Sequence, residues 1–221
     1  MTKTIALLPA LARPLLEHRL PDWLDAHWFM SKEEAVSLAP TAQIAWLDFY
    51  DKADMAAAIR SATRLEWLVS IYAGLDGEPL DALRVRSPVV THGAGINAIT
   101  IAEYVVMGML VIAKGYRDVV RAQERHEWLH DSPGKEELFG SKALILGYGA
   151  IGKPVDARLQ AFGVETTIVR RSGGPNTLSP DAWRAQIQDF DWIILALRPP
   201  FELDELARFA EEVAPHFAPA R

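Results

Sequence analysis

One glycine pattern, midway along the second half of the chain, constrains the fold more than any other feature. Gly147, Gly149 and Gly152 are spaced G-x-G-x-x-G between the apolar run KALIL and a helical stretch that leads to a second β-prone run, VETTIV. In this context the first glycine permits a tight turn, the second lets the backbone approach a pyrophosphate, and the third lets helix and strand pack closely. The pattern predicts a βαβ unit that holds a dinucleotide at a helix N-terminus. The predicted cofactor-binding loop consists of Gly147, Tyr148, Gly149, Ala150, Ile151 and Gly152.

The end of the second strand of this unit predicts which dinucleotide binds. Arg170, Arg171 and Ser172 stand where an NAD site places an acidic residue that accepts hydrogen bonds from the ribose 2′-hydroxyl. A carboxylate repels a 2′-phosphate, whereas a guanidinium offers it charge and paired donors. Glu165 lies at the start of the strand and does not replace the missing acid. We therefore expect NADP(H) to bind in preference to NAD(H); the alternative is that both arginines are solvated surface charges.

Short β-prone runs alternate with helical stretches along the whole chain. Four runs lie before residue 94, near residues 5, 45, 68 and 89, and three lie after it, near residues 145, 166 and 194. This alternation is typical of parallel sheets joined by helical crossovers. We expect an α/β protein of two domains, residues 1–94 and residues 95–221. Leu197, at the end of the last run, is included among the expected cofactor-binding residues.

A long helix is predicted over residues 97–128, after Gly93 and Gly95. Its first half carries apolar side chains around the whole circumference: Ile99, Ile101, Val105, Val106, Met109, Leu110 and Ile112. Such a helix is expected to be buried on all sides. It either lies in the core between the domains or turns its outer face to a second subunit, and the two interpretations are compatible. The uncharged run within it is shorter than the roughly 20 residues of a membrane span, so we expect no membrane partner.

Composition argues against several functions. The net charge of −6 does not suit binding to nucleic acid, because such binding needs a basic surface that displaces counterions. The absence of cysteine excludes disulfides and thiolate metal sites, and it permits a reducing compartment. The histidines show no metal-ligand spacing, so no metal site is predicted. The N-terminus, broken by Pro9 and Pro14, indicates a strand rather than a signal peptide, and we expect a cytoplasmic protein.

Several stretches resemble the D-isomer-specific 2-hydroxyacid dehydrogenases. The segment ELFGSKALILGYGAIGKPVDARLQAFG is similar to the start of that family's cofactor domain. Upstream, LEWLVSIYAGLDGEPLDAL resembles the family's substrate loop, and THGAGINAITIAEYVVMGMLVIAKGYRDV resembles its interdomain helix. Trp128 stands where the family often has a tryptophan. The resemblance covers roughly residues 65–198.

The resemblance implies a flavodoxin-like N-terminal domain plus an incomplete Rossmann domain, that is, a doubly wound parallel sheet. It also implies a homodimer built on the long helix, and hydride transfer between NAD(P)H and a small 2-keto or 2-hydroxy acid. Ala73 and Gly74 match the positions where the family's backbone amides hold the substrate carboxylate; the alternative is a simple turn. Asn97 and Glu103 also match family positions, but we favour helix capping and structural hydrogen bonds for them.

The catalytic part of the family pattern is not recognisable. After DWIILALRPP the family normally continues to an Arg, a Glu and a His that reduce the keto acid, whereas this chain ends in FELDELARFAEEVAPHFAPAR. Pro215 and His216 resemble the family's Pro-His pair only superficially, because they follow the last strand too closely and lack an Arg or Glu partner. His92 is the other histidine expected near the cleft. The final stretch predicts an amphipathic helix with one apolar face: Leu203, Leu206, Phe209, Ala210 and Val213.

We therefore assign no catalytic residue. Reduction of a keto acid needs a cation at the carbonyl and an imidazolium with its carboxylate partner, so we expect negligible reduction of glyoxylate or hydroxypyruvate. Three interpretations stay open. The chain is a dehydrogenase-family protein that keeps the cofactor loop, a non-catalytic dinucleotide-binding or dimerisation module, or a truncated fragment.

Overall fold

The computed structural model describes residues 3–75, 78–180 and 182–195. The chain forms two compact units, Met1–Ile96 and Asn97–Arg221. The predicted amphipathic helix near the C-terminus, His216 and the expected cofactor residue Leu197 all lie outside the described residues.

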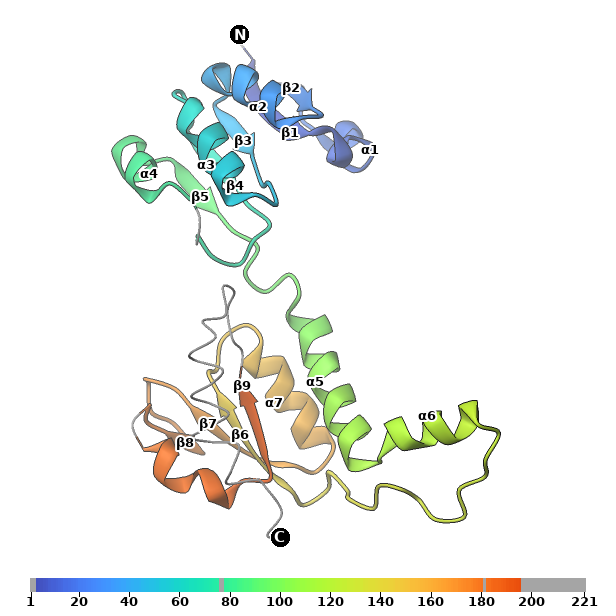
Figure 1. Cartoon of the computed structure of the whole chain (residues 1–221). Helices are drawn as coiled ribbons and strands as arrows, with labels where there is room; N and C mark the ends of the chain where they lie inside the picture. Colours follow the sequence, from blue (N-terminus) through green and yellow to red (C-terminus); the bar gives the residue numbers. More distant parts are fainter. Residues whose placement is uncertain (1–2, 76–77, 181, 196–221) are drawn as a thin grey trace. The chain divides into compact units, whose positions relative to one another are not determined.

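The first unit is built on a five-stranded parallel sheet with the strand order β2-β1-β3-β4-β5 (Figure 1). This order is that of flavodoxin-like folds and confirms the expected fold class. The strands are β1 Thr4–Pro9, β2 Leu24–Phe29, β3 Ile44–Trp46, β4 Trp67–Val69 and β5 Val89–Thr91. The strand β2 was not predicted: it lies at the sheet edge, and Asp25 and His27 interrupt its apolar pattern.

Helices connect these strands and enclose a core of aliphatic side chains. Leu7, Leu47, Ile59 and Leu68 are fully buried in it. The Asp51 side chain caps α3 by accepting hydrogen bonds from the amides of Ala53 and Asp54 at 2.8 and 3.1 Å. The helices are η1 Ala10–Ala12, α1 Arg13–Leu16, η2 Glu17–Arg19, α2 Lys32–Leu38, η3 Ala39–Thr41, α3 Lys52–Ser61 and α4 Leu80–Arg86.

The second unit contains a four-stranded parallel sheet with the order β8-β7-β6-β9. Numbered along the chain, this order reads 3-2-1-4, which is the first part of the classic Rossmann order. The strands are β6 Lys142–Leu146, β7 Glu165–Val169, β8 Thr177–Leu178 and β9 Trp192–Leu195, and the helices are α5 Ala98–Ala113, α6 Tyr116–Glu124, α7 Gly152–Ala161 and η4 Trp183–Asp189. All seven predicted strands are present, and the two-residue β8 was missed.

The prediction of one helix over residues 97–128 is wrong. The segment contains two helices, α5 and α6, that are bent by 69° at the break between them. Gly115 forms this break with a left-handed φ of +58°, a conformation that favours glycine. A Cβ atom at Gly134 would overlap the backbone of Lys114 and Gly115, so the two glycines let these segments touch. Trp128 lies beyond α6 and is 83% exposed.

The expectation that this helix is buried on all sides is also wrong for the single chain. The buried face of α5 carries Ala98, Ala102, Val106, Met109 and Ala113 and packs against α7 (Figure 1). The other face leaves large apolar side chains exposed: Ile99, Ile101, Tyr104, Met107 and Ile112. Small residues on one face let two helices approach closely, which leaves the bulky residues on the other face without a partner among the described residues.

No single helix in the described part of the chain is long and apolar enough to cross a membrane. The pair α5 and α6 passes a test of length and composition, but only with the 69° bend between the two helices.

Candidate functional site

The candidate site in the second unit starts where β6 ends. Gly147 follows the strand with a φ of +106°, so the turn requires a residue without a side chain. The Gly147 amide donates a 3.0 Å hydrogen bond to the Val169 carbonyl, which extends the pairing of β6 with β7 by one residue. The chain then turns within four residues into α7 at Gly152.

The three glycines of the motif have different surroundings. A Cβ atom at Gly152 would overlap the Gly147 carbonyl oxygen, so a glycine is needed for α7 to begin beneath the end of β6. At Gly149 a Cβ atom would have no neighbouring atom within 4 Å among the described residues. This part of the chain therefore leaves the space beside Gly149 open.

The unpaired backbone amides of the loop indicate an anion-binding site. Within the described part of the chain, the amides of residues 148–152 donate no hydrogen bond, and the first amide bonded in the helical manner is that of Lys153, to the Gly149 carbonyl at 3.2 Å. Unpaired amides at a helix N-terminus carry a partial positive charge and bind phosphate groups. The exposed Lys153 adds a full positive charge beside them.

A buried carboxylate, which the sequence reasoning did not identify, holds the loop. Asp156 in α7 is only 5% exposed, and it accepts a 2.8 Å hydrogen bond from the Tyr148 hydroxyl. Thr166 of β7 and Gln160 of α7 donate to its other oxygen at 2.6 and 2.9 Å. The bond to Asp156 raises the pKa of Tyr148, because it stabilises the protonated hydroxyl. Asp156 thus links the glycine loop, α7 and β7 through hydrogen bonds.

The predicted discriminating residues follow β7 at its carboxyl end. The Arg170 guanidinium lies over the Tyr148 ring, with its central carbon 5.5 Å from the ring centroid. Arg171 and Ser172 are exposed. Glu165 begins β7 and pairs with Lys142, at the opposite end of both strands. The structure therefore brings Arg170 next to the glycine loop and leaves Glu165 remote from it.

The predicted substrate loop lies at the carboxyl edge of the sheet in the first unit. Ala73 is exposed, and Gly74 is half-buried, shortly after the end of β4. Asp48 fixes the start of this loop: it accepts hydrogen bonds from the Ser70 hydroxyl at 2.7 Å and from the Ile71 amide at 2.6 Å. The Trp46 indole donates to the same carboxylate at 2.8 Å. Ligands of open α/β sheets bind at this edge, so the position of the loop suits a binding role.

A second acidic residue lies near Asp48. Glu78 is 8% exposed, and its Oε2 atom has no hydrogen-bond partner among the described residues. Burial, and to a smaller extent the charge of Asp48, raises the pKa of Glu78 to about 7. Sequence reasoning missed Glu78 because nothing in its local pattern shows that it is buried.

The remaining predicted positions have structural contacts. His92 is exposed, and its Nδ1 accepts a 3.2 Å hydrogen bond from the Ala94 amide. Asn97 occupies the N-cap position of α5, but its side chain makes no capping hydrogen bond, so that expectation is wrong. Glu103 accepts a 3.4 Å hydrogen bond from Arg158 of α7, a structural role of the expected kind.

A glycine loop that opens a helix in a 3-2-1-4 parallel sheet defines a dinucleotide-binding domain of the Rossmann class. Residues 106–198 match the family model described as "D-isomer specific 2-hydroxyacid dehydrogenase, NAD binding domain". The second unit therefore resembles the NAD-binding domain of the D-isomer-specific 2-hydroxyacid dehydrogenase family.

Individual relatives agree with this resemblance. The D-3-phosphoglycerate dehydrogenase of Mycobacterium leprae is 25% identical over 153 residues, which cover 61% of this chain and 29% of the relative. The match therefore spans less than a third of that curated relative. Among solved structures, a D-isomer specific 2-hydroxyacid dehydrogenase family protein from Aeromonas salmonicida is 25% identical, with a TM-score of 0.76 over 95% of this chain and 69% of its own. An NADPH-dependent glyoxylate/hydroxypyruvate reductase from Sinorhizobium meliloti shares the fold at 18% identity, with a TM-score of 0.67 over 87% of this chain and 62% of its own.

Proposed function

We propose that this protein binds a nicotinamide dinucleotide through residues 147–152 and prefers NADP(H) to NAD(H). The observation that carries the proposal is the position of Arg170 beside the glycine loop, at the end of β7 where an NAD site has an acid. The free amides of residues 148–152 suit the pyrophosphate. Arg171 and Ser172 add a second cation and a hydroxyl donor for the 2′-phosphate, and Leu197 remains assigned to the same site.

A titration tests this preference. We expect the unaltered chain to bind NADPH at least about tenfold more tightly than NADH, since a guanidinium forms charge-assisted hydrogen bonds with a phosphate. Replacing Arg170 and Arg171 together by Ala should weaken NADPH binding and leave NADH binding nearly unchanged. Tighter binding of NADH by the unaltered chain, measured by fluorescence or calorimetry, would refute the assignment.

We further propose that the family reaction, hydride transfer between NAD(P)H and a small 2-keto or 2-hydroxy acid, is the activity to which this chain is related. The amides of Ala73 and Gly74 would hold the acid's carboxylate. For this chain alone we propose negligible reduction of glyoxylate or hydroxypyruvate, which makes a non-catalytic dinucleotide-binding module the second candidate. A spectrophotometric assay decides between the two: turnover within about tenfold of a common enzyme rate of 10 per second would contradict negligible activity.

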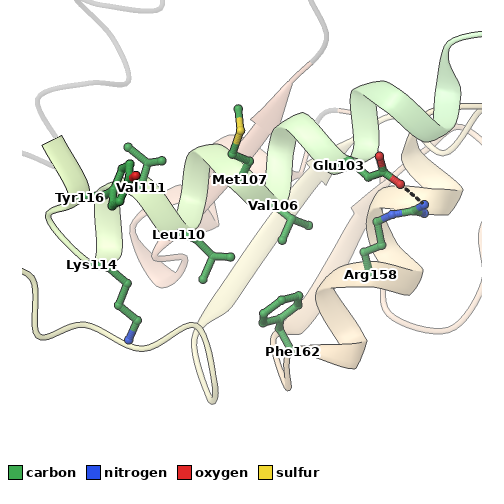
Figure 2. Close-up of a pocket in the computed structure, with 9 residues that line it drawn as sticks. All are labelled: Glu103, Val106, Met107, Leu110, Val111, Lys114, Tyr116, Arg158 and Phe162. Atoms are coloured by element: carbon green, nitrogen blue, oxygen red, sulfur yellow. Dashed lines mark hydrogen bonds and ion pairs between the residues drawn. The ribbon is translucent and has the colours of Figure 1, made fainter. Parts of the chain in front are cut away.

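We also propose a homodimer. The exposed face of α5 continues into an apolar groove of about 620 Å³ between α5 and the end of α7 (Figure 2). Figure 2 shows Val106, Leu110 and Phe162 projecting into this groove, with the Glu103–Arg158 pair at one end. Exposed apolar surface of this kind is typical of protein interfaces.

Sedimentation velocity at micromolar concentration tests the dimer. We expect one species of twice the chain mass for the unaltered protein and a monomer for Leu110→Asp, because burying that charge in an apolar interface is unfavourable. A clean monomer for the unaltered chain would disprove the homodimer.

A further inference from the structure

The Arg170 side chain occupies one defined place although it follows a strand at the protein surface. Its guanidinium lies over the Tyr148 ring, and its Nη2 donates a 3.0 Å hydrogen bond to the Gly173 carbonyl. A Cβ atom at Gly174 would overlap Nη2, so the chain leaves room for the guanidinium at that point. A guanidinium held on two sides loses less conformational freedom when it binds a phosphate than one that moves in water.

The arginine keeps donors that the described residues do not use. Its Nε atom is buried and has no hydrogen-bond partner among those residues. A buried N–H group without an acceptor is unfavourable, so the guanidinium is held with one unsatisfied donor. The planar group offers five N–H donors in total, of which one is donated to Gly173. The side chain is therefore positioned, but its hydrogen bonds are not complete.

The Tyr148 ring contacts the Arg170 guanidinium, and Tyr148 is itself fixed by a hydrogen bond. Its hydroxyl donates to Asp156, whose carboxylate also receives Thr166 and Gln160. A carboxylate that is 5% exposed is stable only with such partners, so this group of contacts is ordered rather than exchanging with water. A continuous series of contacts thus runs from Asp156 through the Tyr148 ring to Arg170.

We propose that Tyr148 is a positioning residue for Arg170 and thereby sets the preference for a dinucleotide with a 2′-phosphate. This inference rests on the proposed function of the site. Tyr148 acts by fixing the guanidinium rather than by touching the phosphate, and Asp156 acts by fixing Tyr148. The role differs from that of the glycines, which make room for any dinucleotide without distinguishing the two cofactors.

The test uses two substitutions at Tyr148 in the full chain. Tyr148→Phe keeps the ring but loses the bond to Asp156, and Tyr148→Leu loses both. The probes are adenosine 2′,5′-bisphosphate and adenosine 5′-monophosphate, and the measured quantity is the ratio of their dissociation constants by calorimetry. We expect Tyr148→Leu to reduce the preference for the bisphosphate about fivefold, in line with the strength of a cation–π contact. Tyr148→Phe should reduce it less, about twofold, because the ring remains but is no longer fixed by Asp156. Tyr50→Leu is the control, because Tyr50 is 100% exposed in the first unit.

A double-mutant cycle separates positioning from a merely structural role. Arg170→Ala should remove most of the preference, and adding Tyr148→Leu or Tyr148→Phe to it should change the ratio no further. Equal weakening of both probes by Tyr148→Leu, or an unchanged ratio in Tyr148→Phe and Tyr148→Leu, would overturn the inference while the proposed NADP(H) preference stands. If the unaltered chain binds neither probe, or shows no preference, the proposed function and this inference both fail. The Phe variant keeps the test decisive if the Leu variant does not fold.

Discussion

Two loops follow parallel strands in this protein, and they are shaped by different means. The loop of residues 147–152 is shaped by its own backbone: Gly147 has a left-handed φ, and Gly152 lies against the Gly147 carbonyl oxygen. The start of the loop after β4 is instead held by a side chain from another strand end, because Asp48 binds Ser70 and Ile71. A loop made by glycines is visible as a local sequence motif, whereas a loop made by a distant carboxylate is not.

The two loops should also respond differently to substitution. Backbone overlap at Gly152 leaves no flexible side chain that could move aside, so any substituent there must displace the loop or the helix. In the other loop a single carboxylate accepts three hydrogen bonds, so one substitution removes three contacts while the backbone keeps its freedom to adjust. A substitution at Gly152 should therefore distort the backbone of the glycine loop. A substitution at Asp48 should cost hydrogen bonds, while the backbone of its loop can relax.

The first prediction breaks the glycine loop. Gly152→Ala should lower the free energy of unfolding by about 3 kcal/mol, the upper range for forcing a methyl group into a packed place. It should also weaken dinucleotide binding, because α7 can no longer begin at the same point. Gly149→Ala is the matched control: its Cβ has open space, so stability should be nearly unchanged while dinucleotide binding still weakens. Equal stability of the two variants in urea unfolding would show that the overlap at Gly152 is relieved at little cost.

The second prediction breaks the other loop. Asp48→Ala leaves the Trp46 indole, the Ser70 hydroxyl and the Ile71 amide without their acceptor, and we expect a loss of about 2 to 3 kcal/mol at about 1 kcal/mol per bond. Asp48→Asn keeps one acceptor oxygen and should lose less than half as much. Chemical unfolding followed by tryptophan fluorescence measures both. A variant Asp48→Ala as stable as the unaltered chain would mean that the loop is held by other contacts.

The third prediction concerns the pH dependence of the same region. The pKa of Glu78 in the folded protein, about 7, lies above its ordinary value of 4.5. Between these two values the folded protein keeps the proton that the unfolded chain releases, so stability is full below pH 4.5 and falls as the pH rises through 7. We expect this fall to be about 2 kcal/mol, since water partly screens the buried charge.

The variant Glu78→Gln should be free of that fall, which urea unfolding at pH 5 and pH 8 can measure. In Asp48→Asn the fall should end at a lower pH than in the unaltered chain, because the charge of Asp48 contributes to the raised pKa of Glu78. An identical pH dependence in Glu78→Gln and the unaltered protein would assign the effect to another group.

The fourth prediction concerns the coupling energy of an exposed ion pair outside both loops. Arg60 and Asp81 form an exposed ion pair at 2.7 Å between α3 and α4. A double-mutant cycle with Arg60→Ala and Asp81→Ala should give a coupling much smaller than the loss in Asp48→Ala, because water and salt screen exposed ion pairs. A coupling as large as the loss in Asp48→Ala would remove the distinction between a loop anchor and a surface contact.

Much of the fold was predictable because apolar strands and the glycine loop leave local patterns. The seven predicted strands are found, whereas β2 was missed because it is a mixed edge strand and β8 because it has only two residues. The break between α5 and α6 had a local signal in Gly115, but the polar helical pattern beyond it suggested a continuous helix.

The candidate site divides in the same way. The glycine loop and Arg170 were predicted from spacing, and the structure brings them together. Asp156 had a weak signal, because it lies between the buried Val155 and Leu159 on the apolar face of α7. Asp48 had none, since its partners Ser70 and Ile71 are distant in the sequence and only the parallel pairing of β3 with β4 brings them near.

The contact between Gly115 and Gly134 has a consequence for how this protein could change over evolutionary time. The segment that carries α6 and Trp128 leaves the domain and returns to it at one point, where the two backbones touch and Lys114 also donates a 2.7 Å hydrogen bond to the Glu136 carbonyl. The cost of closing a loop depends only weakly on its length. Insertions, deletions and wholesale replacement between these glycines should therefore leave the sheet of the second unit intact, so this excursion can acquire new sequences faster than the domain from which it projects.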